Sequence, residues 1–198
     1  MKLIHIIVVI ATFLPLLLIN SCNPEQESDV DWIARAEEAS NHSNIDSLRD
    51  AWCYFNEAYK EDNEIDRSIV RRILETSESQ FKHYMDSDSI GALNEAAKYC
   101  DLMNEITNKL YPSANEGNTD DFEVISLPDD FPTYNEWEVV AHKKELSAKY
   151  ISQGISAVDL CEKHADPIEC DRVRESFEMA VKYDDSETTR KYKDKYCK

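Results

Sequence analysis

Apolar residues recur at steps of three and four along most of the chain, the spacing that places side chains on one face of an α-helix. The pattern predicts a short helix over Ser28–Ser40, a second after a capping Asn44, a third from Asp66 and a fourth opened by Asp88 or Ser89. The fourth should end before Pro112, because a residue that precedes proline is disfavoured in the helical conformation. The apolar positions of the last three segments are Ile45, Leu48, Trp52, Phe55 and Tyr59; Ile69, Val70, Ile73, Leu74, Phe81, Tyr84 and Met85; and Leu93, Ala96, Ala97, Cys100, Met103, Thr107 and Leu110.

A long helix is predicted in the second half of the chain. Thr133 and Glu136 form a capping-box pattern at its start, and Gly154 should bend or divide it, since glycine costs up to ~1 kcal/mol against alanine in a helix. Its predicted apolar face comprises Trp137, Val140, Ala141, Lys144, Ala148, Ile151, Ile155 and Val158.

The clearest helix start is Asp166-Pro167-Ile168-Glu169, with an aspartate cap, proline at the first helical position and a glutamate at the third. Val173, Phe177, Ala180 and Val181 form the apolar positions of this helix. A final short, basic helix follows Asp184-Asp185. Short connections between helices favour antiparallel neighbours. We therefore expect an all-α fold of six to eight helices, arranged as an antiparallel bundle or as stacked helical hairpins.

Residues 112–133 have a different composition, with three of the six prolines, six acidic residues and no basic residue. They predict one long acidic loop, in which 122–126 could add a short strand. The nearby aromatic residues either fasten the loop to the helices or form a partner-binding edge, because aromatic anchors with polar rims are typical of interfaces. The partner-binding candidates are Phe122, Phe131, Tyr134 and Trp137, with Asp120, Asp121, Asp129 and Asp130 as an acidic rim.

Two short patterns concern the type of helical hairpin. Ala51-x3-Phe55-x2-Ala58 resembles the second helix of a tetratricopeptide repeat, and Phe177-x2-Ala180 repeats part of it with Val173 in place of the first alanine. The Trp-Leu-Gly signature of the first repeat helix is missing. An irregular bundle uses the same small and aromatic residues at these spacings, so both arrangements stay open.

The N-terminus has the features of an export signal. One basic residue, Lys2, precedes an uncharged apolar run from Leu3 to Ile19 that is interrupted by Pro15 and has no basic stop-transfer cluster after it. We therefore predict that residues 1–21 are a cleaved signal peptide, and that residues 32–198 form a single helical domain.

The signal ends in Ile19-Asn20-Ser21-Cys22, which resembles the lipobox of bacterial lipoproteins. The resemblance implies cleavage before Cys22, acylation of its sulfur and its amine, and anchoring at the outer membrane or cell surface through lipid alone. The polar, acidic residues 22–31 then serve as a flexible tether. The alternative is an ordinary secretory signal, a secreted protein and a disulfide at Cys22.

Composition restricts the partners. Without residues 1–21 the chain has 21 basic and 40 acidic residues, a net charge of −19. The electrostatic field of this negative charge repels nucleic acid and anionic lipid, and it favours a basic protein as partner. Only 3 of 198 residues are glycine, and they are isolated, which excludes glycine-rich phosphate-binding loops.

With Cys22 lipidated, Cys53, Cys100, Cys161, Cys170 and Cys197 remain as disulfide candidates, in keeping with an exported protein. The predicted hairpin brings the last three to one end. We favour Cys170–Cys197, which would clamp the final helix, over Cys161–Cys170. A zinc site formed by Cys161, His164, Cys170 and Cys197 is the alternative, but an oxidising destination favours disulfides.

No catalytic motif stands out, and paired acids are expected by chance among 40 acidic residues. The leading hypothesis is therefore a non-enzymatic binding lipoprotein without a cofactor or metal, which recognises another protein. It would act as an inhibitor or immunity protein, or as an accessory subunit of an envelope complex. The alternative is an envelope hydrolase with a dispersed site.

Overall fold

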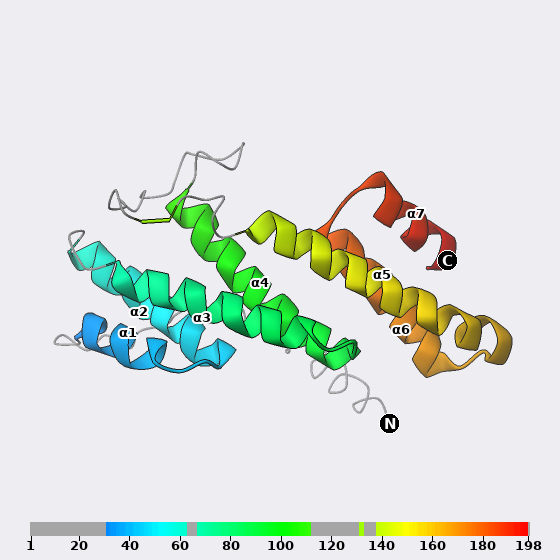
Figure 1. Cartoon of the computed structure of the whole chain (residues 1–198), viewed down its shortest axis with the longest axis horizontal. Coiled ribbons are helices and arrows are strands. Elements are labelled where there is room, and N and C mark those ends of the chain that lie inside the picture. The colour runs from blue at the N-terminus through cyan, green and yellow to red at the C-terminus, as the bar shows by residue number, and fades with distance from the viewer. Residues whose placement is uncertain (1–30, 63–66, 112–130, 133–137, 198) are drawn as a thin grey trace, which may run out of the picture. The chain divides into compact units, whose positions relative to one another are not determined.

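The computed structural model describes residues 31–62, 67–111, 131–132 and 138–197, which form seven α-helices and no strand (Figure 1). The helices are α1 (Trp32–Ser40), α2 (Ile45–Glu61), α3 (Ser68–Met85), α4 (Ile90–Leu110), α5 (Val139–His164), α6 (Pro167–Tyr183) and α7 (Glu187–Tyr196). The predicted all-α fold is confirmed. The signal segment, residues 112–130 with the possible strand, Thr133 and Glu136 lie outside the described residues. None of the described helices is both long and apolar enough to span a membrane.

Helices α2 and α4 begin at residues whose side chains cap them. The side chain of Asn44 accepts a hydrogen bond from the Ser47 amide at 2.9 Å, and Ser89 accepts one from the Ala92 amide at 3.1 Å. Each bond satisfies an amide that has no partner within the first helical turn. At the other end of α4, Leu110 is the last helical residue, as the following Pro112 predicts.

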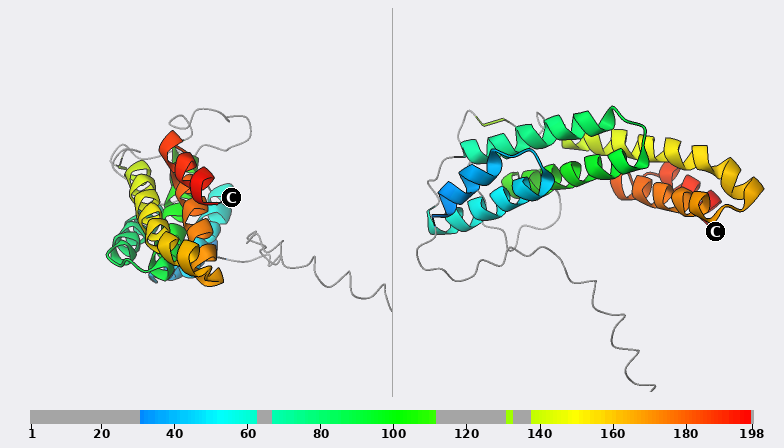
Figure 2. Two further views of the ribbon diagram at one scale, coloured as in Figure 1. Left: turned by 90° about the vertical axis from the view of Figure 1, so that its right-hand side faces the viewer. Right: turned by 90° about the horizontal axis from the view of Figure 1, so that it is seen from below.

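Consecutive helices pair as hairpins, α1 with α2, α3 with α4 and α5 with α6 (Figures 1 and 2). Helix α5 also packs on α4 and so joins the last hairpin to the others, while α7 packs mainly on α6. The main core is formed by residues of helices α1 to α5, and the end of α6 contributes two further residues, Ala180 and Tyr183. The positions that resemble a tetratricopeptide repeat are all buried, namely Ala51, Phe55, Ala58, Val173, Phe177 and Ala180.

A second, smaller core lies between α5, α6 and α7. It consists of Ala157, Val173 and Phe177. The Phe177 ring stacks against both Tyr192 and Tyr196 of α7, with ring centroids 5.8 and 5.4 Å away. These stacked rings attach the short, mostly polar helix α7 to α6. Thr189 is the only fully buried residue of α7.

The structure corrects two expectations for α5. Gly154 does not divide it, because α5 is one continuous helix from Val139 to His164. The helix also begins later than the capping-box pattern indicates: Glu138 precedes it with a left-handed φ of 50°, so the helical conformation does not extend back through that residue.

The buried face of α5 also differs from the prediction. The residues that face the core are Val139, His142, Leu146, Ser147, Tyr150, Gly154 and Ala157. Of the predicted residues, Val140, Ala141, Lys144, Ala148 and Ile155 are exposed, whereas Ile151 and Val158 are half-buried and pack against the cores. The observed face is rotated by about one residue, or ~100°, because hydrogen-bonded polar side chains occupy it. Ser147 donates to the Ala180 carbonyl at 2.8 Å and Tyr150 to Asn94 at 2.7 Å, which removes the cost of burying them.

Candidate functional site

The end of α3, the turn into α4 and residues 145–149 of α5 line an open groove with a volume of about 340 Å³. Its lining residues are Phe81, Lys82, Met85, Asp86, Asp88, Glu145 and Lys149. Helical spacing explains this set, because residues four apart lie on one face: Phe81 and Met85 on α3, and Glu145 and Lys149 on α5. Asp86 caps the C-terminus of α3, and Asp88 lies in the turn before α4.

The two lysines of the groove are engaged by neighbouring groups. Lys82 donates to Glu78 at 2.6 Å, and this hydrogen bond holds the Lys82 pKa above its ordinary value. Lys149 donates to the Met85 carbonyl and lies 3.1 Å from an Asp88 oxygen. The carboxylates of Asp86 and Glu145, by contrast, form no ion pair or hydrogen bond with another described residue. The groove therefore has two exposed carboxylates on its rim that are not paired with a described residue, although the charge of Glu145 also acts on Lys82.

Apolar groups form the floor of the groove. Phe81 is 1 % and Met85 5 % exposed. His142 of α5 packs on Phe81, with ring centroids 4.5 Å apart, and its Nε2 atom has no hydrogen-bond partner among the described residues. Burial lowers the pKa of His142, although the negative charge of Glu78, 3.7 Å away, opposes this shift. His142 is therefore neutral near pH 7 and adds no positive charge beside the groove.

The predicted partner-binding residues fall mostly outside the described residues, which include only Phe131. Its side chain is 8 % exposed, and the Arg71 guanidinium lies over the ring at 5.3 Å. Phe131 is therefore a core residue rather than an exposed anchor. Phe122, Tyr134, Trp137, Asp120, Asp121, Asp129 and Asp130 lie outside the described residues.

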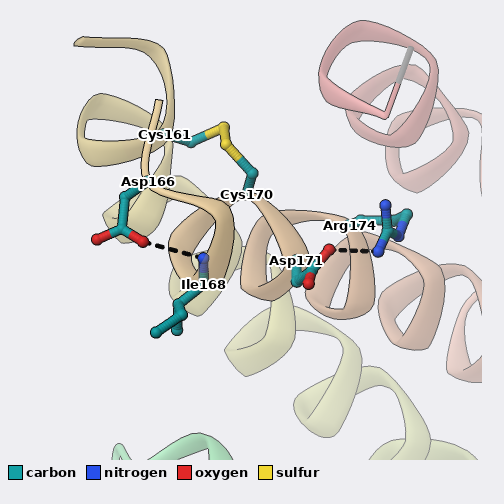
Figure 3. The surroundings of a disulfide bond; sticks show 6 residues. All are labelled: Cys161, Asp166, Ile168, Cys170, Asp171 and Arg174. Carbon is teal, nitrogen blue, oxygen red and sulfur yellow. Dashed lines mark hydrogen bonds and ion pairs between the residues drawn. A yellow bond between two sulfur atoms is a disulfide. The ribbon is translucent and has the colours of Figure 1, made fainter. Parts of the chain in front are cut away.

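The preferred disulfide was wrong. Cys161 pairs with Cys170, with Cα atoms 4.8 Å apart (Figure 3). Cys197 is free. The cause is local: Ala165 ends α5 in a left-handed conformation, and Asp166 caps α6 through the Ile168 amide, so the tight turn juxtaposes the two sulfurs. Cys197 instead contacts the carbonyl of Arg174, one helical turn beyond Cys170.

The other cysteines differ in state. Cys53 is disulfide-bonded. Cys100 is a buried free thiol, and burial raises its pKa to about 12. A thiol in this state is a weak nucleophile. The Cys161–Cys170 bond also uses two sulfurs of the alternative zinc set, and the described residues contain no group of three His, Cys, Asp or Glu side chains arranged to hold a metal ion.

Sequence reasoning did not find the groove. The pairs Phe81/Met85 and Glu145/Lys149 are ordinary helical spacings, and no local signal indicates that the end of α3 meets the middle of α5. The comparisons with known proteins add no relative: no family model matches the chain, and no curated protein or solved structure is significantly similar to it.

Proposed function

We propose that this protein is a non-enzymatic binding protein, anchored in a cell envelope through Cys22, that recognises a basic protein. It acts as an inhibitor or immunity protein, or as an accessory subunit of an envelope complex. The observation that carries the proposal is the excess of acidic over basic residues, 40 against 21 without residues 1–21.

Many basic side chains of the described helices are engaged within their own helix. Lys60 pairs with Glu57, Lys98 with Glu95, and Arg174 with Asp171, each three residues away. Such pairs use the few cations locally and leave the surplus of acids exposed. Exposed pairs of this kind contribute little stability, so their main effect here is on how charge is distributed over the surface.

Asp46 and Asp50 on α2 illustrate the surplus. They lie one helical turn apart, and the pKa of Asp50 is raised by partial burial and by the negative charge of Asp46. Burial is the larger cause, and the repulsion between the two carboxylates on this acidic surface adds to it. A surface with this property attracts a cationic partner from a distance and speeds its association.

The envelope location rests on the apolar run Leu3–Ile19 and the lipobox-like Ile19-Asn20-Ser21-Cys22. Acyl chains on Cys22 would hold the domain at a membrane whose anionic surface repels it. This arrangement leaves the acidic helical surface available to a soluble or membrane-bound basic protein.

The test is affinity capture from an envelope extract of the source cell, with residues 22–198 immobilised. We expect basic proteins that are retained at low salt and released as salt rises, because exposed charges more than about 10 Å apart are screened at 0.1 M. An unrelated helical protein of the same net charge is the control for nonspecific capture. Partners that are acidic, independent of salt, or equally retained by this control would contradict the proposal.

A further inference from the structure

We propose that α5 pairs in antiparallel orientation with α5 of a second copy of this chain, through the face of the helix that points away from its own core. This outward face comprises Ala141, Lys144, Ala148, Ile151, Ile155 and Val158. The proposed function concerns a basic partner, and the pairing of two copies does not depend on it.

The spacing of the outward face is that of a helix–helix seam. Its residues follow one another at alternating steps of three and four along the continuous helix Val139–His164. An apolar repeat with this average period of 3.5 residues is typical of two helices that pack side by side. The core residues Leu146, Tyr150 and Ala157 lie on the opposite side of the helix. Helix α5 therefore has one apolar face for its own core and a second one directed outwards.

The outward face is largely uncovered by the residues that the structure describes. Ile155 is 46 % exposed, and Ala141 and Ala148 are exposed as well. Ile151 and Val158 are half-buried along the edge that adjoins the cores. A partner that removes these apolar side chains from water gains free energy, and the two alanines allow its helix to approach closely.

The single charged residue of the outward face favours an antiparallel second copy as the occupant. Lys144 forms no ion pair or hydrogen bond with another described residue. In an antiparallel pair with its two-fold axis between Ala148 and Ile151, Lys144 lies opposite Ile155 of the second copy. A parallel pair would instead place Lys144 opposite Lys144. A polar residue in an apolar seam selects the orientation in this way.

The antiparallel register also supplies an acceptor for Lys144. Asp159 lies one helical turn beyond Ile155 and is exposed. Helical side chains lean towards the N-terminus, so the Lys144 ammonium extends towards Asp159 of the second copy. Within its own helix Asp159 binds Lys163 through one oxygen, Oδ2. The symmetric pair thus brings together two Lys144–Asp159 contacts.

The overall charge makes the predicted dimer weak. With 21 basic and 40 acidic residues after residue 21, the net charge of −19 repels a second copy. Dimerisation should therefore tighten as salt rises to about 0.2 M, because repulsion beyond a Debye length of ~10 Å is screened. Capture of a basic partner should weaken over the same range, so either proposal can fail without the other.

The experiment is sedimentation equilibrium of residues 22–198, of which residues 32–198 form one compact unit. We expect a reversible monomer–dimer equilibrium between about 1 µM and 1 mM protein. Non-reducing gel electrophoresis excludes a covalent dimer through the free Cys197. A protein that stays monomeric over the whole range would overturn the proposal.

Ile155→Glu should weaken dimerisation by more than about ten-fold, because the seam would then bury two unpaired carboxylates. Leu160→Glu is the matched control: Leu160 is also 46 % exposed but lies ~140° around the helix from Ile155. It adds the same charge and should change the dissociation constant by less than about two-fold. Circular dichroism verifies that both variants fold. Equal weakening in both would overturn the outward face as the interface.

Asp159→Lys tests the orientation. It makes each copy less negative, so a nonspecific charge effect would strengthen dimerisation. The antiparallel register predicts a weakening by about five-fold instead, because Lys144 would face a lysine in both halves of the dimer. Adding Lys144→Asp restores opposite charges and the parent net charge, and should return the dissociation constant to within about two-fold of the parent value. Tighter dimerisation of Asp159→Lys, or no recovery in the double variant, would overturn the antiparallel pairing.

Discussion

The ring of Phe177 on α6 occupies the space that a β-carbon on Gly154 of α5 would need. An ideal β-carbon at Gly154 would lie 2.9 Å from Cζ of Phe177 and 3.0 Å from Cε1. The ring is fully buried and stacks against Tyr192 and Tyr196, which restricts its movement away from Gly154. The close approach of α5 and α6 therefore depends on glycine at position 154.

Gly154→Ala should consequently lower the free energy of unfolding, although alanine is the better helix former by up to ~1 kcal/mol. Overpacking of this kind costs about 1–3 kcal/mol, and urea denaturation followed by circular dichroism measures it. Gly91→Ala in α4 is the matched control, because a β-carbon there meets nothing within 4 Å. A Gly154→Ala protein as stable as the parent would mean that Phe177 can move aside.

Loss of the Cys161–Cys170 disulfide should destabilise the protein. The bond closes a loop with a sequence separation of 9, for which chain entropy gives about 2.5 kcal/mol. Replacing both cysteines by serine should therefore reduce the free energy of unfolding by about that amount. Cys197→Ser is the control and should have a small effect because Cys197 is free. The opposite ranking of the two variants would indicate the Cys170–Cys197 bond instead.

Stability should depend on the protonation of His142. Burial lowers its pKa in the folded state, whereas in the unfolded state it titrates near the ordinary value of about 6.5. The unfolded chain then binds more protons, so stability is complete above about pH 6.5 and is lost as pH falls towards the folded-state pKa.

His142→Phe should flatten this pH dependence, as measured by urea denaturation at several pH values between about 7 and 5. His164→Gln replaces an exposed histidine of the same helix and should leave the dependence intact. A slope that survives in His142→Phe would assign the effect to another group.

Acylation of Cys22 is testable by metabolic labelling with a palmitate analogue in a bacterial host. The parent protein should be labelled and membrane-associated, while Cys22→Ala should be neither, because the sulfur that carries the lipid is missing. Peptide mapping without reduction provides the opposing result. A peptide that links Cys22 to Cys53, which is disulfide-bonded, would exclude lipidation of the Cys22 sulfur and favour the secreted alternative.

The helices, and the starts of α2, α4 and α6, could be predicted from the sequence because the interactions that determine these starts are local. Asn44, Ser89 and Asp166 each bond to an amide two or three residues away, so the residues that signal a helix start are also the ones that form it. The apolar faces of α2, α3 and α4 followed the hydrophobic pattern for the same reason.

The pattern failed for α5, where polar groups are buried. His142, Ser147 and Tyr150 face the core, and two of them are hydrogen-bonded to Ala180 of α6 and Asn94 of α4. These partners are 33 and 56 residues distant. A hydrophobic pattern ranks such side chains as exposed, since the sequence does not specify which distant groups will satisfy them.

By itself, the sequence determined the all-α class, the capped helix starts and the strong negative charge, because these depend on neighbouring residues or on composition. Only the tertiary structure decided the orientation of α5, the pairing of Cys161 with Cys170 and the groove in which Glu145 approaches Asp86. Each of these depends on how helices from different parts of the chain pack together. Packing is set by the fit of side chains such as Phe177 against Gly154, which no local pattern contains.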